Sequence, residues 1–436
     1  MISDMLAAMA AAAPGGFDVE AATRAYLDTL QGAARERSDS YFEGGYWMLL
    51  WGALVSVASA WIMLRFGWSA AWSRWAGRVT KRRWLQPALY GLPFVIVSTL
   101  IVVPWTLYAG WWREREYGLM NQSLVAWLGE QAIGLAVGTV MTAILLAIVY
   151  AVIRRAPRSW WLWATGAVVA FMAFAILISP VFISPLFNDY RPMEPGPMRD
   201  QILAMARAHD VPAENVYVFD QSRQHNRISA NVSGLGPTIR ISLNDNLLNR
   251  ASPAEVKAVM GHELGHYVLG HIWKLLLGFG LVVLVGFFLL SRLAPRILAR
   301  RGERWGVSEV ADPASAPLLL AIFSVYALVA TPVTNSIIRM EESEADAFGL
   351  EAAREPDGFA ATAMKLSEYR KIEPSPVEEA IFFDHPSGRT RVRMAMEWKA
   401  RHLAELPPEQ RGIVRPAPPA AASQAPARQG APPPAR

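Results

Sequence analysis

Six long apolar segments divide the chain. Each holds about 20 mostly hydrophobic residues, the length that a helix needs to cross the roughly 30 Å hydrocarbon core of a bilayer. They are residues 46–64, 87–107, 132–153, 160–178, 272–290 and 318–338. The last of them contains Pro332, where we expect a kink. The pattern predicts a mainly α fold, a multi-pass helical membrane protein with about six spans.

A polar stretch of different periodicity separates the fourth span from the fifth. Its segment NVYVFD alternates like a strand, and RISANVSGLG with TIRISL predicts a β-hairpin. A helix follows, because Ser252 is a good N-cap, Pro253 suits the first helical position and Glu255 completes a capping box. We expect this helix to run without a break into the fifth span.

These signals predict six parts of the chain. They are an N-terminal segment (1–45), transmembrane helices 1–4 (46–183), a polar domain (184–271), transmembrane helices 5–6 (272–338), a helical C-terminal part (339–402) and a disordered Pro/Ala-rich tail (403–436). The first residues, MISDMLAAMAAAAPGG, lack a basic region and do not have the pattern of a signal peptide.

Composition supports a membrane protein and excludes several kinds of chemistry. Hydrophobic residues make up 53% of the chain, charged residues only 18%, and there are 17 tryptophans. The net charge of +5 is concentrated in short arginine-rich loops, which indicates topology and not a surface for nucleic acid. Because the chain has no cysteine, disulfides, thiolate zinc sites and cysteine nucleophiles are excluded. Any metal must be held by His, Asp or Glu.

The arginine-rich loops follow the first, third and fifth spans, which places all of them on one side of the membrane. The positive-inside rule assigns that side to the cytoplasm. The polar domain and the C-terminal part would then lie on the opposite side.

The stretch AVMGHELGHYVLGH carries the candidate chemistry. His262 and His266 are four residues apart, so on a helix they share one face at about 5–6 Å and can bind one zinc ion. Glu263 can reach the metal-bound water as a general base, as in HExxH metallopeptidases. A chance match is the alternative, but histidine is rare here and the helix start is well signalled. His271 lies off the zinc face, and we expect it to mark the aqueous boundary of the fifth span.

The third ligand is expected where the sixth span ends, because the helical pair between the two segments crosses the bilayer and returns. Within NSIIRMEESEADAFG, Glu342 is the candidate ligand, and Asp346 could accept a hydrogen bond from the second ring nitrogen of a ligand histidine. The alternative for this cluster is a solvated acidic face, which is our expectation for Glu341 and Glu344.

From about residue 34 to about residue 398 the chain resembles the type I CAAX prenyl endopeptidases, integral-membrane zinc metallopeptidases, and their bacterial relatives. HELGHYVLGH matches the family's zinc helix, and NSIIRMEESEADAFG matches its Asn…Ser-Arg…Glu-x-x-x-Asp segment, with Ile338 in place of the serine. YGLMNQSLVAWLGEQ and ISPVFISPLFNDYRPM are similar to its membrane loops. SANVSGLGPTIRISLNDNLL is similar to its substrate-binding edge strand, and DHPSGRTRVRM to its His-Pro…Arg segment.

The resemblance implies a fold and roles for particular residues. The fold would be a chambered helical barrel, capped by a zincin-like domain with a small β-sheet. His385 would stabilise the transition state. Supporting roles would fall to Arg391, Asn335 and Arg339, and substrate binding to Ser229, Ala230 and Asn231. The family usually has seven spans, and its first span has no counterpart in this sequence.

The sequence therefore predicts a CAAX prenyl protease-like zinc metalloendopeptidase that hydrolyses peptide bonds with a zinc-activated water and binds one Zn²⁺ per chain. The expected partners are a peptide or protein substrate, prenylated in some family members, and membrane lipid, but no nucleic acid; the oligomeric state stays open. A bacterial-type plasma membrane is favoured over the endoplasmic reticulum. The side of the active site stays open, because the eukaryotic family has its zinc on the cytosolic side and the arginine loops here predict the opposite.

Three alternatives remain at this point. A quality-control protease without a lipid requirement would use the same site, so only substrates separate the two. A multi-pass transporter or metal carrier would place its polar groups near the bilayer midplane on broken helices, whereas here they lie at span ends and no repeat is present. An inactive scaffold would not need the base and all the proposed ligands to be intact.

Overall fold

The structure is a computed structural model and describes residues 16–234 and 239–413. Its described part contains six helices that are long and apolar enough to cross a membrane, so the mainly α, six-span prediction is confirmed. The helices are α3 (Gly32–Arg65), α5 (Gln86–Leu107), α7 (Leu124–Arg155), α8 (Trp160–Ile178), α12 (His271–Trp305) and α13 (Ala316–Ala353). Each predicted span lies inside one of them.

Several of these helices extend well beyond the predicted spans. α3 begins at Gly32, and α5 continues through a π-helical turn, Tyr108–Trp112, into α6 (Arg113–Glu116). α13 remains helical through Pro332 and runs on to Ala353, so the candidate ligand Glu342 lies on the same helix as the sixth span. The kink expected at Pro332 stays a prediction.

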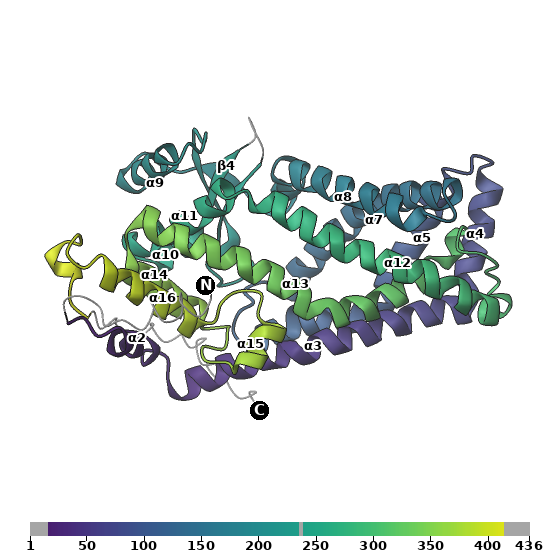
Figure 1. Cartoon of the computed structure of the whole chain (residues 1–436). Coiled ribbons are helices and arrows are strands. Elements are labelled where there is room, and N and C mark those ends of the chain that lie inside the picture. The colour runs from purple at the N-terminus through teal and green to yellow at the C-terminus, as the bar shows by residue number, and fades with distance from the viewer. Residues whose placement is uncertain (1–15, 235–238, 414–436) are drawn as a thin grey trace, which may run out of the picture.

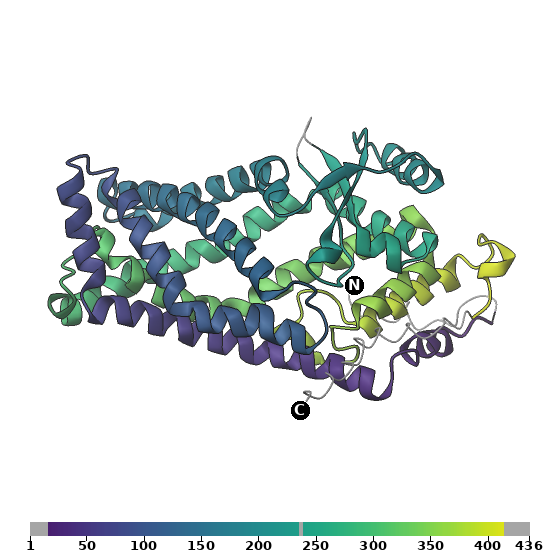
Figure 2. The ribbon, with the colours of Figure 1, turned by 180° about the vertical axis from the view of Figure 1, so that it is seen from behind.

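The molecule is elongated, and α3 runs along much of its length (Figure 1). The sheet, α9 (Pro197–Ala208) and α11 (Pro253–Val268) lie at one end, and α4 (Trp68–Val79) lies at the other. The view from behind shows that α5 and α7 close the side of the bundle opposite α12 and α13 (Figure 2). Extensive exposed apolar surface on these helices, for example at Trp51, Val140 and Leu277, suits contact with lipid.

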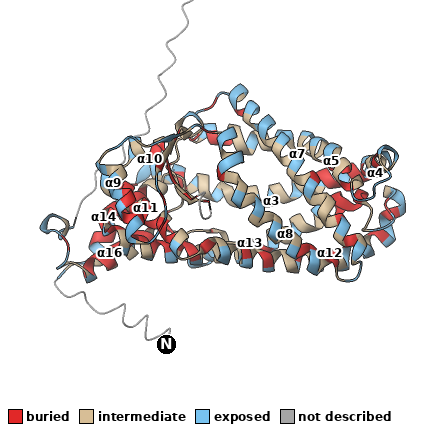
Figure 3. Ribbon diagram, turned by 90° about the horizontal axis from the view of Figure 1, so that it is seen from above, coloured by how far each residue is buried: buried red, intermediate tan, exposed pale blue. Residues whose placement is uncertain are grey.

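Buried residues gather at the two ends of the molecule (Figure 3). At the end with the sheet, Val216, Ile241 and Leu243 of the strands pack with Met260 and Leu264 of α11. A second core at the same end joins α2 (Val19–Leu27), α14 (Pro356–Leu366) and α16 (Gly388–Arg401). The helix that carries the candidate zinc ligands is therefore fixed on one side by the sheet and on the other by the C-terminal helices.

The sheet is larger than the predicted strand and hairpin. β3 (Ala230–Ser233) and β4 (Arg240–Asn244) pair antiparallel, as expected for the hairpin. β2 (Val216–Phe219) pairs with β4 in parallel, and β1 (Tyr190–Pro192), which was not predicted, pairs antiparallel with β2. The strand order β1-β2-β4-β3 leaves β3 at an edge of the sheet.

The prediction that the His262 helix runs unbroken into the fifth span is wrong. Ser252 and Glu255 form the expected capping box, but α11 ends at Val268. Gly270 has φ +66°, in the left-handed region where glycine is the favoured residue, and its backbone nitrogen donates to the carbonyl of Tyr267. A new helix, α12, begins at the next residue, so the chain changes direction just after the HExxH segment.

The C-terminal part is helical as predicted, with α14, α15 (Pro376–Phe382) and α16. The predicted tail begins too early, because residues 403–413 are folded onto α16. The buried ammonium of Lys399 donates to the carbonyl of Gly412 at 2.8 Å and pairs with Asp357 at 2.7 Å. The rest of the predicted tail, from residue 414, and the N-terminal residues 1–15, on which the signal-peptide expectation falls, lie outside the described residues.

Candidate active site

Two helices touch backbone to backbone beside the HExxH segment. A Cβ atom added to Gly349 of α13 would lie 2.7 Å from the backbone nitrogen of His262, and one added to Gly261 of α11 would lie 2.8 Å from the carbonyl oxygen of Gly349. Both distances are too short for any side chain. One turn further along, Gly265 faces the backbone of Ala345. These small residues bring the acidic face of α13 directly against the histidines of α11.

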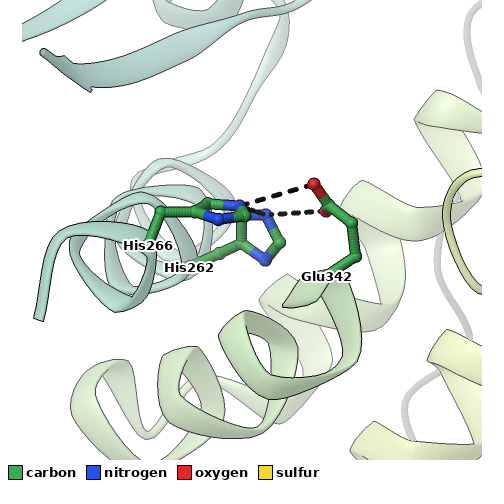
Figure 4. Close-up of side chains that lie close together, drawn as sticks. All are labelled: His262, His266 and Glu342. Atoms are coloured by element: carbon green, nitrogen blue, oxygen red, sulfur yellow. Dashed lines mark hydrogen bonds and ion pairs between the residues drawn. The ribbon is translucent and has the colours of Figure 1, made fainter. Parts of the chain in front are cut away.

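This contact brings three candidate metal ligands together (Figure 4). The Nε2 atom of His262 lies 3.3 Å from Oε2 of Glu342, and the Nε2 atom of His266 lies 3.5 Å from Oε1 of the same carboxylate. The two Nε2 atoms are 3.1 Å apart. Oε2 of Glu342 is buried without a well-formed hydrogen bond among the described residues. Two imidazoles and a carboxylate with an unsatisfied oxygen fit a divalent metal such as zinc.

A buried ion pair stands behind His262. Oδ1 of Asp346 lies 2.8 Å from Nδ1 of His262, the ring nitrogen that faces away from Glu342. Arg391, on α16, holds this carboxylate through two contacts, Nε to Oδ2 at 2.9 Å and Nη2 to Oδ1 at 2.5 Å. Asp346 is completely buried. The paired charges fix the orientation of the ring and leave its Nε2 lone pair directed at the cluster.

His385 also reaches the cluster. Its Nε2 atom lies 3.2 Å from Oε2 of Glu342, and its Nδ1 atom lies 2.8 Å from Oδ1 of Asp384. Asn335 and Arg339 do not contact the ligands but hold the chain that leads to His385. Asn335 donates to the carbonyl of Ile381 at 2.9 Å.

Arg339 adds to this support. Its guanidinium donates to the carbonyl of Glu379 at 2.9 Å and to that of Phe383 at 2.5 Å. Its other Nη atom lies 3.1 Å from the hydroxyl of Ser336. The sixth-span helix thus fixes both Glu342 and the loop that presents His385.

Glu263 opens on a cavity of about 700 Å³. No side chain of the described residues donates a hydrogen bond to its carboxylate, and burial raises its pKa to about 7. A carboxylate with such a pKa can accept and release a proton near neutral pH.

The cavity also reaches the sheet edge. Ser229 and Ala230 line it, together with His262 and His385. Asn231 does not; it lies opposite Ser242 in the β3–β4 pair. The edge strand and the cluster are therefore open to the same space, in which an extended peptide could lie.

Three expectations near the cluster are corrected by burial and contacts. His271 is only 1% exposed and does not mark an aqueous boundary; its Nδ1 lies 2.8 Å from Nδ1 of His266. Glu341 is buried and not solvated. Glu344 is half exposed, but its Oε2 lies 3.2 Å from Nε2 of His271. Sequence reasoning missed the His271 contact because it assumed one continuous helix, on which residues 266 and 271 point apart.

Comparison with known proteins agrees with this geometry. Residues 192–399 match the model of peptidase family M48, and residues 23–189 match the model described as CAAX prenyl protease N-terminal, five membrane helices. Within residues 23–189, four helices are long and apolar enough to span a membrane.

Individual relatives point the same way. The chain is 30% identical to the Bacillus subtilis protein named uncharacterized metalloprotease YhfN, over 77% of this chain and 79% of that one. It is 29% identical to the probable CAAX prenyl protease 1 of Schizosaccharomyces pombe, over 42% of this chain and 38% of that protein's length.

The fold is also shared with a solved structure. The crystal structure of S. mikatae Ste24p superposes with a TM-score of 0.69 and 18% identity, covering 87% of this chain and 96% of that one. With the matches to both family models and the six apolar helices, this settles the class of the protein. The chain belongs to peptidase family M48 and is a multi-pass membrane metalloendopeptidase related to the CAAX prenyl proteases.

Proposed function

We propose that this metalloendopeptidase uses a single zinc ion held by His262, His266 and Glu342. The observation that carries the proposal is the convergence of their three donor groups, from two helices, beside a cavity that also reaches the edge strand of the sheet. A ligand set of two imidazoles and one carboxylate leaves a position open, which is typical of a catalytic zinc site and not of a structural one.

When bound there, zinc supplies a positive charge for the scissile carbonyl and acidifies the attacking water. Glu263 takes the proton from the water and then passes it to the leaving amine, a role that suits its free carboxylate and its pKa of about 7. His385, in its imidazolium form, directs Nε2–H into the cavity while Nδ1–H contacts Asp384, and so stabilises the negative charge that develops on the carbonyl oxygen.

We propose that the substrate lies extended along β3. β3 is an edge strand, so one row of its backbone groups has no partner strand among the described residues and can pair with a peptide. Ser229 and Ala230, where this strand enters the cavity, lie closest to the chemistry. Asn231 would contribute through the strand backbone and not as part of the cavity wall.

We further propose that the cluster faces away from the cytoplasm in a bacterial-type plasma membrane. The arginine-rich segments around α4 and beyond α12 lie at the end of the molecule opposite the sheet and α11 (Figure 1). The positive-inside rule assigns that end to the cytoplasm.

Cleavage of a mixed peptide library by the purified protein tests the proposed function. The library contains unprenylated peptides and farnesylated peptides with a C-terminal CAAX sequence, and products are identified by mass spectrometry. We expect cleavage by the wild type and a loss of about 10²–10⁴-fold in Glu263→Gln with zinc retained, because only the base is removed. Normal cleavage by Glu263→Gln would contradict the assigned role.

The same experiment separates the two substrate classes. Preference for the farnesylated peptides supports a CAAX prenyl protease-like activity. Equal cleavage of unprenylated peptides supports a quality-control protease acting at the same site.

A further inference from the structure

The second zinc ligand, His266, has a partner of its own that the catalytic proposal does not use. His271 is the first residue of α12, directly after the left-handed Gly270, and its ring turns back toward α11. Its Nδ1 atom lies 2.8 Å from Nδ1 of His266, and the two rings meet edge to face with centroids 5.0 Å apart. The imidazole is buried, with an exposure of 1%.

The hydrogen positions on these rings follow from the chemistry of ligation. To bind a metal through Nε2, a neutral His266 carries its hydrogen on Nδ1 and must donate it. The atom within reach is Nδ1 of His271, which must then be the acceptor. His271 therefore carries its own hydrogen on Nε2.

That hydrogen has an acceptor in place. Oε2 of Glu344, on α13, lies 3.2 Å from Nε2 of His271. The ammonium of Lys274, one turn along α12, lies 2.5 Å from the same oxygen and favours the charged carboxylate. Each donor in the series thus meets an acceptor, and the series ends in an ion pair at the surface.

We infer that His271 is a positioning residue for the zinc site, and that Glu344 fixes His271 for this task. The series His266–His271–Glu344 does for one ligand what Asp346 and Arg391 do for His262: it sets the tautomer, orients the ring and increases the basicity of the ligating nitrogen. The inference rests on the proposed zinc site.

The geometry also explains why the chain breaks at Gly270. A continuous helix would direct residue 271 away from residue 266, since residues five apart on a helix do not share a face. The left-handed turn restarts the helix at a new angle and places the imidazole behind the ligand. The break between the HExxH helix and the fifth span is thus part of the site's construction.

The test is zinc affinity, measured by chelator competition on full-length apoprotein in detergent. His271→Leu removes the acceptor while keeping an apolar group of similar volume, and we expect it to weaken zinc binding by about 10–100-fold. His271→Asn keeps an oxygen close to the position of Nδ1 and should restore most of the affinity. Wild-type affinity in His271→Leu, or an Asn variant as weak as the Leu variant, overturns the inference.

Matched controls address folding and the proposed site itself. Glu344→Gln should weaken zinc binding less than His271→Leu, whereas Glu341→Gln, at a neighbouring buried carboxylate that contacts no histidine among the described residues, should leave it unchanged. Equal effects of these two variants contradict the role of Glu344. If the wild type itself binds no zinc, the proposed function fails; if only His262→Ala loses zinc and His271→Leu does not, this inference alone fails.

Discussion

The Cα atom of Gly349 has no room for a side chain, because a Cβ atom there would lie 2.7 Å from the backbone nitrogen of His262. This contact sets the distance between the two helices that carry the candidate ligands. A methyl group would force α11 and α13 apart and move Glu342 away from the histidines.

We therefore expect Gly349→Ala to destabilise the fold by about 1–3 kcal/mol, the usual cost of overpacking, and to lower zinc content. Gly166→Ala is the control, since that glycine of α8 has no atom within 4 Å of its would-be Cβ. Thermal unfolding in detergent and zinc analysis of both variants check this. Equal zinc content and equal stability would show that the helix contact does not set the site.

The ion pair behind His262 leads to a second prediction. Asp346→Asn keeps the size of the side chain but removes the charge that pairs with Arg391 and faces Nδ1 of His262. We expect zinc affinity to fall about 10–100-fold, as measured by chelator competition. Asp200→Asn, on the exposed face of α9, is the control and should bind zinc like the wild type. An unchanged affinity in Asp346→Asn would be inconsistent with a role for this carboxylate in holding the ligand.

His385 gives a prediction that separates catalysis from metal binding. His385→Gln should retain zinc, because the other three side chains supply the ligands, but should lower kcat by about 10²–10³-fold through loss of a charged donor at the developing oxyanion. KM should change little. Zinc loss in this variant would instead make His385 a ligand, which its 3.2 Å contact with Glu342 makes a meaningful outcome to measure.

Membrane topology can be tested cleanly because the natural chain contains no cysteine. Single cysteines placed at Arg78, on the arginine-rich end, and at Arg191, an exposed residue beside the sheet, report the two sides. We expect an impermeant thiol reagent added to intact cells to label Arg191→Cys and not Arg78→Cys. The reverse pattern would place the active site in the cytoplasm.

The sequence predicted the spans well because each is a long apolar run, a signal that needs no tertiary information. The hairpin and the capping box at Ser252 were also predicted, since both depend on local residue types. The strand β1 was missed because Tyr190–Pro192 is too short to show a period. The parallel pairing of β2 with β4 depends on the path of the chain in space, which a local pattern does not contain.

Around the cluster, spacing brought His262 and His266 together on paper, and the structure places Glu342 against both. The contact of His271 could not be predicted from helical spacing once the break at Gly270 was overlooked. Yet a signal was present: a glycine that follows the last helical residue is typical of a helix end. The small residues Gly261, Gly265 and Gly349, spaced for close helix contact, could likewise have indicated that α11 and α13 touch.

Zinc content and peptide cleavage, measured on the same preparations, test the central claim most directly. The samples are the wild type, the wild type treated with a chelator and then given zinc again, and Glu342→Gln. We expect about one zinc per chain in the wild type, loss of cleavage on chelation, recovery on adding zinc, and little zinc or cleavage in Glu342→Gln. A metal-free preparation that cleaves at the full rate, or a Glu342→Gln variant with normal zinc and normal cleavage, would contradict the account.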